Sequence, residues 1–97
     1  MGEPMVLHEW KRFFAPVILY RGQAYYREKD VKKLEWDNGV LTALVEGTEE
    51  YHVSIRVRDG EAEEMRCSCP YAAGGAHCKH MAAVLFEIVS GLQVNCE

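Results

Sequence analysis

Residues 67–80 read CSCPYAAGGAHCKH and hold three cysteines and two histidines in one short stretch. Cys67, Cys69, Cys78 and His80 form the pattern C-x-C, eight residues, then C-x-H. Three thiolates and one imidazole are a common ligand set for tetrahedral structural zinc. A mixed cysteine and histidine set also favours zinc over iron. We therefore predict one Zn²⁺ per chain, held by these four residues.

The spacing of the four ligands has a physical rationale. Cys67 and Cys69 are two residues apart, so both sulfurs point the same way if they sit at the end of a strand. Cys78 directly precedes an apolar stretch with helical spacing, and His80 falls in its first turn. Free backbone N–H groups at a helix N-terminus stabilise thiolates. The pattern thus predicts a zinc loop over residues 67–80 that connects a strand to a helix.

Other interpretations of these residues stay open at this point. Cys67 and Cys69 could form a redox pair, although C-x-C is not the usual C-x-x-C and Cys78 would then be unexplained. The cysteines could also be ordinary structural residues. His77 could replace His80 as the fourth ligand, although it adjoins Cys78 and would need strained geometry. Cys96 is expected to be a free thiol.

Hydrophobic periodicity predicts an α+β fold with a small antiparallel meander of about four strands. Asp37-Asn38-Gly39 is a strong hairpin signal between two of the strands, and Arg58-Asp59-Gly60 indicates another turn. The alternating pattern of residues 51–57 predicts a sheet with one wet face. The expected helices are 8–14, 17–29 and 80–92, and the expected strands are 31–36, 40–46, 51–57 and 61–67. The last helix has apolar residues at 81, 84, 85, 88, 89 and 92, a stripe that would pack on the dry face.

Length and charge limit the kind of protein. The 97 residues are expected to form one domain, 1–97, with an N-terminal lead-in at 1–30. The net charge of -4 argues against an overtly basic nucleic-acid binder. Residues 1–33, however, hold seven Lys/Arg against four Asp/Glu.

This N-terminal excess of positive charge suggests a partner-binding face. If residues 17–29 are helical, Arg21, Tyr25 and Lys29 share one side of the helix. A basic face with an aromatic residue can follow phosphates and stack on a base. The alternative is that Tyr25 or Tyr26 packs inward and the charges only solvate the helix. The candidate face for nucleic acid or another partner comprises Arg21, Tyr25, Arg27, Lys29, Lys32 and Lys33.

No targeting or membrane-spanning stretch is visible in the sequence. The first residues lack a basic segment followed by an apolar one, and the longest apolar run is too short to span a bilayer. We expect a cytoplasmic protein, or a nuclear one if the source is eukaryotic, where thiols stay reduced and available to a metal.

The zinc-loop residues resemble the SWIM zinc finger, whose pattern is C-x-C, a variable gap, then C-x-H. Pro70 directly after the second cysteine and the apolar helix from Met81 fit the same family. Arg21-Gly22 and Tyr25-Tyr26, followed by a strand meander, look like the lead-in of many prokaryotic SWIM proteins. The resemblance covers roughly residues 20–90, and the matching ligands are Cys67, Cys69, Cys78 and His80.

The resemblance implies a binding module for DNA, protein or both, of the kind found with Swi/Snf-type helicases and in recombination-associated proteins. We expect no enzyme activity, because four protein ligands leave no open position on zinc for a water or substrate. We likewise expect no small-molecule substrate and no membrane partner. The alternative function is a purely protein–protein docking module without nucleic-acid binding.

Overall fold

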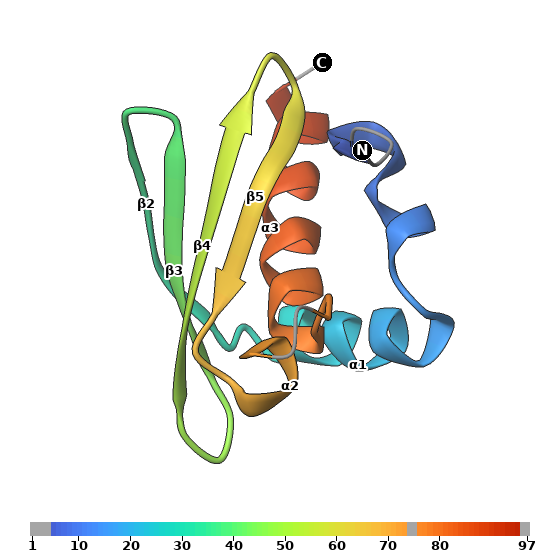
Figure 1. Cartoon of the computed structure of the whole chain (residues 1–97), viewed down its shortest axis with the longest axis vertical. Coiled ribbons are helices and arrows are strands. Elements are labelled where there is room, and N and C mark those ends of the chain that lie inside the picture. Colours follow the sequence, from blue (N-terminus) through green and yellow to red (C-terminus); the bar gives the residue numbers. More distant parts are fainter. Residues whose placement is uncertain (1–4, 74–75, 96–97) are drawn as a thin grey trace.

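The computed structural model describes residues 5–73 and 76–95 as an α+β fold with a five-stranded antiparallel sheet, which confirms the expected class. The strand order is β1-β5-β4-β3-β2. Helix α3 lies between the sheet and the N-terminal segment, and α1 crosses its base (Figure 1). The elements are β1 (Met5–Val6), the 3₁₀ helix η1 (Leu7–Phe13), α1 (Pro16–Arg27), β2 (Val31–Asp37), β3 (Val40–Glu46), β4 (Glu50–Arg58), β5 (Glu61–Cys67), α2 (Pro70–Ala73) and α3 (Lys79–Asn95).

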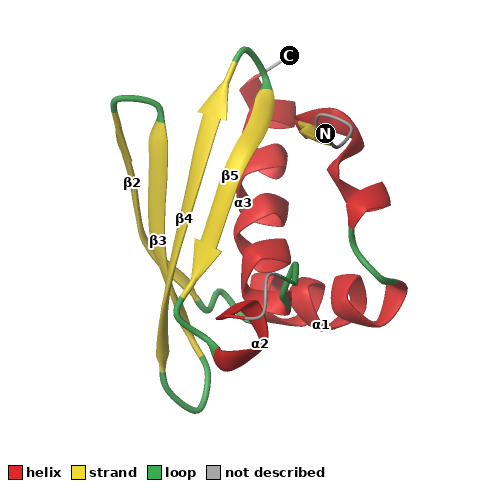
Figure 2. Cartoon of the chain, viewed as in Figure 1, coloured by secondary structure: helices red, strands yellow, loops and turns green. Residues whose placement is uncertain are grey.

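Two tight turns organise the meander as the sequence predicts (Figure 2). Asn38 and Gly39 connect β2 to β3 with φ angles of 51° and 81°. Asp59 and Gly60 connect β4 to β5 with φ angles of 53° and 77°. Positive φ at both central residues is the geometry of type I′ turns, whose twist matches that of the flanking strands. The four expected strands are therefore found within one residue of their predicted bounds.

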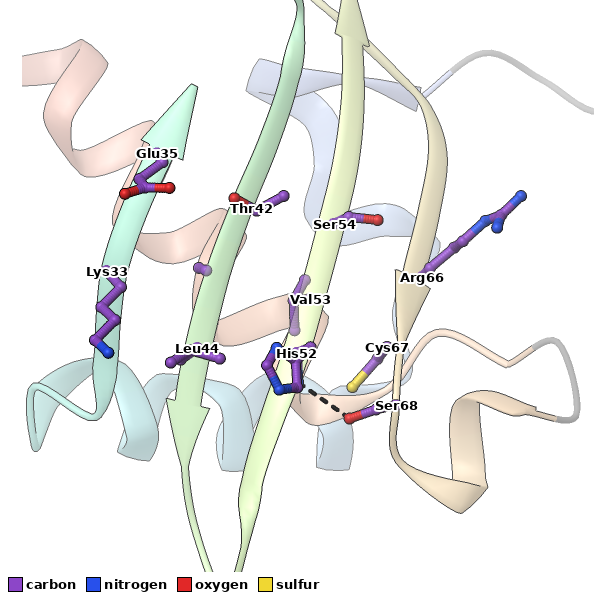
Figure 3. A pocket seen from close by; sticks show the side chains of 11 residues that line it. Lys33, Glu35, Thr42, Leu44, His52, Val53, Ser54, Arg66, Cys67 and Ser68 are labelled. Carbon is purple, nitrogen blue, oxygen red and sulfur yellow. Dashed lines mark hydrogen bonds between the residues drawn. The ribbon is translucent and has the colours of Figure 1, made fainter. Parts of the chain in front are cut away.

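The sheet has one dry and one wet face, as expected. Leu41, Val45 and Ile55 point inward and are fully buried. On the other face Thr42 and His52 are exposed. Figure 3 looks onto this outer face, where a hollow of about 560 Å³ lies over β2–β5 and the backbone N–H of His52 donates to Ser68 Oγ at 3.0 Å.

Helix α3 is buried on a second side as well as along the predicted apolar stripe. Every residue from Met81 to Leu85 is at most 3% exposed, including Ala82 and Ala83. The reason is α1, which packs against the side of α3 that faces away from the sheet. A Cβ at Gly22 of α1 would lie 2.5 Å from the Cβ of Ala82, so only glycine permits this close approach. Gly22, which lowers intrinsic helix propensity, is thus required by tertiary packing.

An aromatic cluster holds the N-terminal segment against the middle of α3. Trp10 is 2% exposed, and its ring meets Phe14 at 5.3 Å and Phe86 at 4.8 Å, both edge to face. Edge-to-face rings at this separation add about 0.5–1.5 kcal/mol beyond the burial of their area. The segment that the sequence predicts as helix 8–14 is the 3₁₀ helix η1.

Helix α1 ends at Arg27, two residues before the predicted end. Lys29 has φ 60° and the backbone N–H groups of Lys29 and Asp30 donate to the carbonyls of Tyr26 and Tyr25. This is a Schellman motif, with lysine at the left-handed position usually taken by glycine. The sequence carries no glycine there, which is why the helix end was wrongly predicted.

Three further differences from the prediction concern short or terminal segments. Strand β1 pairs with β5 through Met5 and Ala62, and two residues are too few to show periodicity. The zinc loop contains the one-turn helix α2. Helix α3 starts one residue earlier and extends three residues further than predicted. The side chain of Leu92 and all of Cys96 lie outside the described residues. Within the part of the chain that the structure describes, no helix is long and apolar enough to cross a membrane.

Candidate metal centre

The four predicted ligands converge on one point between β5, α2 and α3. The ligand atoms of Cys67, Cys69, Cys78 and His80 all lie within 4.8 Å of one another. Cys67 Sγ and His80 Nδ1 are 3.7 Å apart. Zinc bonds of about 2.3 Å to sulfur and 2.0–2.1 Å to nitrogen put those two atoms about 3.6 Å apart in a tetrahedron. The spacing therefore fits a single zinc ion.

Two of the thiols sit at helix N-termini. Cys69 directly precedes α2, and the backbone N–H of Ala72 donates to its sulfur at 3.4 Å. Cys78 directly precedes α3; its carbonyl accepts the first helical bond from Ala82 at 3.1 Å. Cys69 is the N-cap of α2, because its side chain accepts from the third helical N–H, and it takes the place usually held by serine or aspartate. The starts of α2 and α3 thus fix the positions of Cys69 and Cys78.

Hydrogen bonding between the thiols of Cys67 and Cys78 moves their pKa values in opposite directions. The Cys67 thiol donates to Cys78 and, with further hydrogen bonds from His80 and the Met81 backbone, lowers the pKa of Cys78 to about 4. The same hydrogen bond, followed by burial, raises the pKa of Cys67 far above its usual range. Neighbouring buried thiolates repel one another. A divalent cation removes this repulsion and allows all three sulfurs to ionise, so the donor set suits a metal.

The fourth ligand, His80, is clamped between two tyrosine rings. Its side chain is 3% exposed. The Tyr51 ring stacks on it at 4.0 Å with an interplanar angle of 23°, and the Tyr25 ring lies at 5.3 Å on a tilt of 56°. Nδ1 faces Cys67, while Nε2 is buried and has no hydrogen-bond partner among the described residues. The imidazole is therefore oriented by packing.

His77, the alternative ligand, lies outside the cluster. Its Nδ1 donates to the Phe13 carbonyl at 3.0 Å, and its ring lies 5.0 Å from that of Phe14. This contact joins the zinc loop to the N-terminal segment. The structure therefore favours His80 over His77 as the fourth ligand.

The six residues of the predicted partner face are divided among different surroundings. Arg21 lines a pocket of about 230 Å³ that also contains Cys69, Cys78 and His80. Tyr25 is half-buried on His80, with Lys79 Nζ 5.7 Å from its ring centre. Lys32 lies 3.9 Å from Glu46 in an exposed ion pair. The remaining three, Arg27, Lys29 and Lys33, line one groove of about 570 Å³, here called the basic groove.

Two residues that support the centre were missed from the sequence. The alternation of residues 51–57 predicts only that Tyr51 lies in a strand, and Gly22 is noted only as part of the lead-in that resembles SWIM proteins. Nothing local in the sequence links either residue to a metal ligand 16 or more positions away. The pairing of Val53 with Cys67 across β4 and β5 brings Tyr51 beside the zinc loop.

The comparisons with known proteins agree with this geometry. Residues 51–88 match the family model of the SWIM zinc finger. That range begins in β4 and ends in α3, and it includes all four ligands. Comparison with curated proteins and with solved structures gave no match. The predicted resemblance is confirmed over these residues, and the cluster fits one zinc ion.

Proposed function

Because residues 51–88 match the SWIM zinc finger and its four ligands converge, we propose that the chain is a non-catalytic binding module stabilised by structural zinc. The observation that supports this most is the cluster of three thiols and one imidazole, which is buried except for the half-buried Cys67. A tetrahedral zinc with four protein ligands has no position for a reacting water or substrate. The metal then joins β5, α2 and α3 and supports the surface around them. Three thiol ligands suit a reducing compartment such as the cytoplasm or nucleus.

A surface beside the metal centre is the best candidate for docking. Val17, Tyr20 and Tyr71 are large side chains that are 54%, 76% and 58% exposed. Tyr71 lines the pocket at the metal together with Arg21 and Lys79. Val17 and Tyr20 precede Arg21 in α1, and Val17 lies one helical turn before it. We call these five residues the metal-side surface. Tyrosine and arginine are enriched in protein interfaces and at their energetic centres. A protein partner, such as a component of a helicase, recombination or other DNA-processing complex, is the function that this surface supports best.

DNA is the second candidate, and the basic groove favours it. No ion pair among the described residues involves Arg27, Lys29 or Lys33, and these three bases outnumber the one acid of the groove, Glu87. Against DNA, the Tyr25 ring is occupied by His80, and the net charge is -4. With about three phosphate contacts, affinity should be micromolar or weaker and fall with a slope of about -0.9 per contact against log salt on duplex DNA.

A paired experiment on the zinc-loaded chain distinguishes a protein partner from DNA. Affinity purification from the source organism should recover a partner with the parent and lose it with Tyr20→Ser, Tyr71→Ser, while Arg27→Glu, Lys29→Glu retains it. Fluorescence anisotropy with single- and double-stranded DNA at low salt tests the second candidate with the same variants. DNA binding that only the groove variant weakens would replace protein by DNA as the partner. Turnover of any substrate at the zinc would contradict the non-catalytic assignment.

A further inference from the structure

A small pocket beside the metal centre is lined by two positively charged side chains and, among the described residues, by no acidic one. It has a volume of about 230 Å³ and lies where α1, α2 and the start of α3 meet at one end of the molecule (Figure 1). Arg21 of α1 and Lys79 of α3 supply the charges. Pockets for drug-sized ligands start at about 300 Å³. The pocket therefore suits one side chain or a small ion, and its charge favours an anion.

Neither cation is paired with an acidic side chain of the described chain. No ion pair among the described residues involves Arg21 or Lys79. Lys79 Nζ instead lies 5.7 Å from the centre of the Tyr25 ring. Arg21 is exposed, and the planar fork of donors on a guanidinium matches the geometry of a carboxylate. A carboxylate from outside the chain can therefore pair with both.

The metal centre itself offsets only one of these two positive charges. Three thiolates and a neutral imidazole leave a divalent zinc with one net negative charge. Cys69 and Cys78, two of those thiolates, line the same pocket. One positive charge therefore remains in excess beside the loaded centre. A carboxylate carries one negative charge and matches this excess, whereas a phosphate monoester carries nearly two.

The histidine ligand gives an independent reason to expect an acceptor group here. His80 lines the pocket, and its Nε2 is buried without a hydrogen-bond partner among the described residues. Because Nδ1 faces Cys67, Nε2 is the nitrogen that carries the proton once zinc is bound. A metal-bound imidazole usually donates that N–H to a carboxylate, a carbonyl or a water. Among the described residues the chain offers it neither a carboxylate nor a carbonyl.

The surroundings of the pocket favour a peptide over a nucleic acid as the source of the anion. Val17, Tyr20 and Tyr71 are more than half exposed and can pack against the neighbours of an acidic residue. DNA is a polyanion, and the net charge of -4 opposes its approach to a site with one excess charge. We propose that the pocket binds an aspartate or glutamate of a protein partner, whose carboxylate pairs with Arg21 and Lys79. This inference rests on the proposed docking at the metal-side surface and adds the chemistry that the partner presents there.

Nuclear magnetic resonance of the zinc-loaded, ¹⁵N-labelled chain tests the pocket with two matched peptides. One is a capped pentapeptide whose single glutamate lies between two phenylalanines, and the other has glutamine in that place. The glutamate peptide should shift the Nε–H signal of Arg21 and the amide signals of Lys79 and His80, and bind about tenfold more tightly than the glutamine peptide. Arg21→Gln, Lys79→Gln should remove this preference while zinc content stays that of the parent. Arg27→Gln, Lys29→Gln, in the basic groove, is the matched control and should keep it.

Equal binding of the two peptides, or no shift at Arg21 and Lys79 up to about 10 mM of the glutamate peptide, would overturn the proposal. So would an oligothymidylate that binds the pocket more tightly than the peptide, which would assign the pocket to nucleic-acid phosphates. Affinity purification separates this inference from the proposed function. A partner that is lost with Tyr20→Ser, Tyr71→Ser but retained with Arg21→Gln, Lys79→Gln would leave the docking surface standing and reject the carboxylate.

Discussion

Helix α3 is held at two places by different physical means. At its N-terminus, Cys78 and His80 join a polar cluster that fits one metal ion and that Tyr51 stacks against. At its middle, Phe86 meets Trp10 in an apolar contact with no directional bond. The first place depends on four atoms at fixed positions, and the second depends on buried area. Ligand loss should therefore act almost all or none, whereas trimming the aromatic cluster should weaken the fold by degrees.

The largest effect is expected from loss of a metal ligand. Structural zinc contributes about 10–16 kcal/mol in finger peptides near neutral pH, as much as the whole net stability of a typical domain, about 5–15 kcal/mol. Cys78→Ser or His80→Ala should unfold residues 68–79 and loosen α3, seen as loss of zinc and of a cooperative thermal transition. Cys96→Ser, outside the described residues, is the thiol control and should be silent. A Cys78→Ser variant that melts like the parent would refute this.

Trimming the aromatic cluster should have a smaller effect that leaves the metal bound. Trp10 is almost fully buried between Phe14 and Phe86, so Trp10→Ala should lower the free energy of unfolding by about 3–5 kcal/mol. Urea unfolding in the presence of zinc measures this change. The variant should still bind one zinc per chain, because the ring of Trp10 meets Phe14 and Phe86 and not the imidazole of His80. Loss of zinc in parallel with stability would show that the two places are not separable.

A third variant tests the close approach of α1 to the metal end of α3. Gly22→Ala gains about 1 kcal/mol of helix propensity but places a Cβ 2.5 Å from that of Ala82 and 3.0 Å from the Lys79 carbonyl. Overpacking costs typically about 1–3 kcal/mol, so we expect a net destabilisation of up to about 2 kcal/mol. Thermal or urea unfolding of the zinc-loaded chain measures it. An increase in stability would contradict the close packing.

The smallest effect concerns the ring that stacks on His80. Tyr51→Leu removes the 4.0 Å stacking contact and should weaken the centre by about 0.5–1.5 kcal/mol. The readout is faster transfer of zinc to a chromophoric chelator. Tyr20→Leu is the matched control, because that side chain is 76% exposed and lies outside the metal pocket. Equal rates for the parent and Tyr51→Leu would show that stacking does not hold the imidazole.

The parts of the molecule that follow local rules could be predicted from the sequence. The turns at Asn38-Gly39 and Asp59-Gly60 depend on residues that tolerate positive φ, and the strands alternate with period two. The ligand set rests on residue chemistry and spacing within one loop. These features need no knowledge of distant segments, which is why the predicted strands lie within one residue of the observed ones and the loop residues form one Cys/His cluster.

The parts that depend on distant contacts could not be predicted. Ala82 and Ala83 carry little hydrophobic signal, so the burial of that side of α3 under α1 was not visible in the apolar stripe. Tyr25 had two possible orientations, and its packing on His80 follows from how α1 meets α3. The positive φ of Lys29 ends α1 early without a glycine to mark it. At Ala82, Ala83 and Tyr25, tertiary packing overrides a weak local preference.

Titration of the metal-free, reduced chain with Co²⁺ tests the central claim most directly. Cobalt replaces zinc in such sites, and its visible absorption reports tetrahedral geometry and thiolate ligation. The four-ligand centre predicts intense bands that saturate at one equivalent, disappear on addition of zinc, and are lost with His80→Ala but not with His77→Ala. Saturation at another stoichiometry, weak octahedral bands, or dependence on His77 in place of His80 would contradict the account.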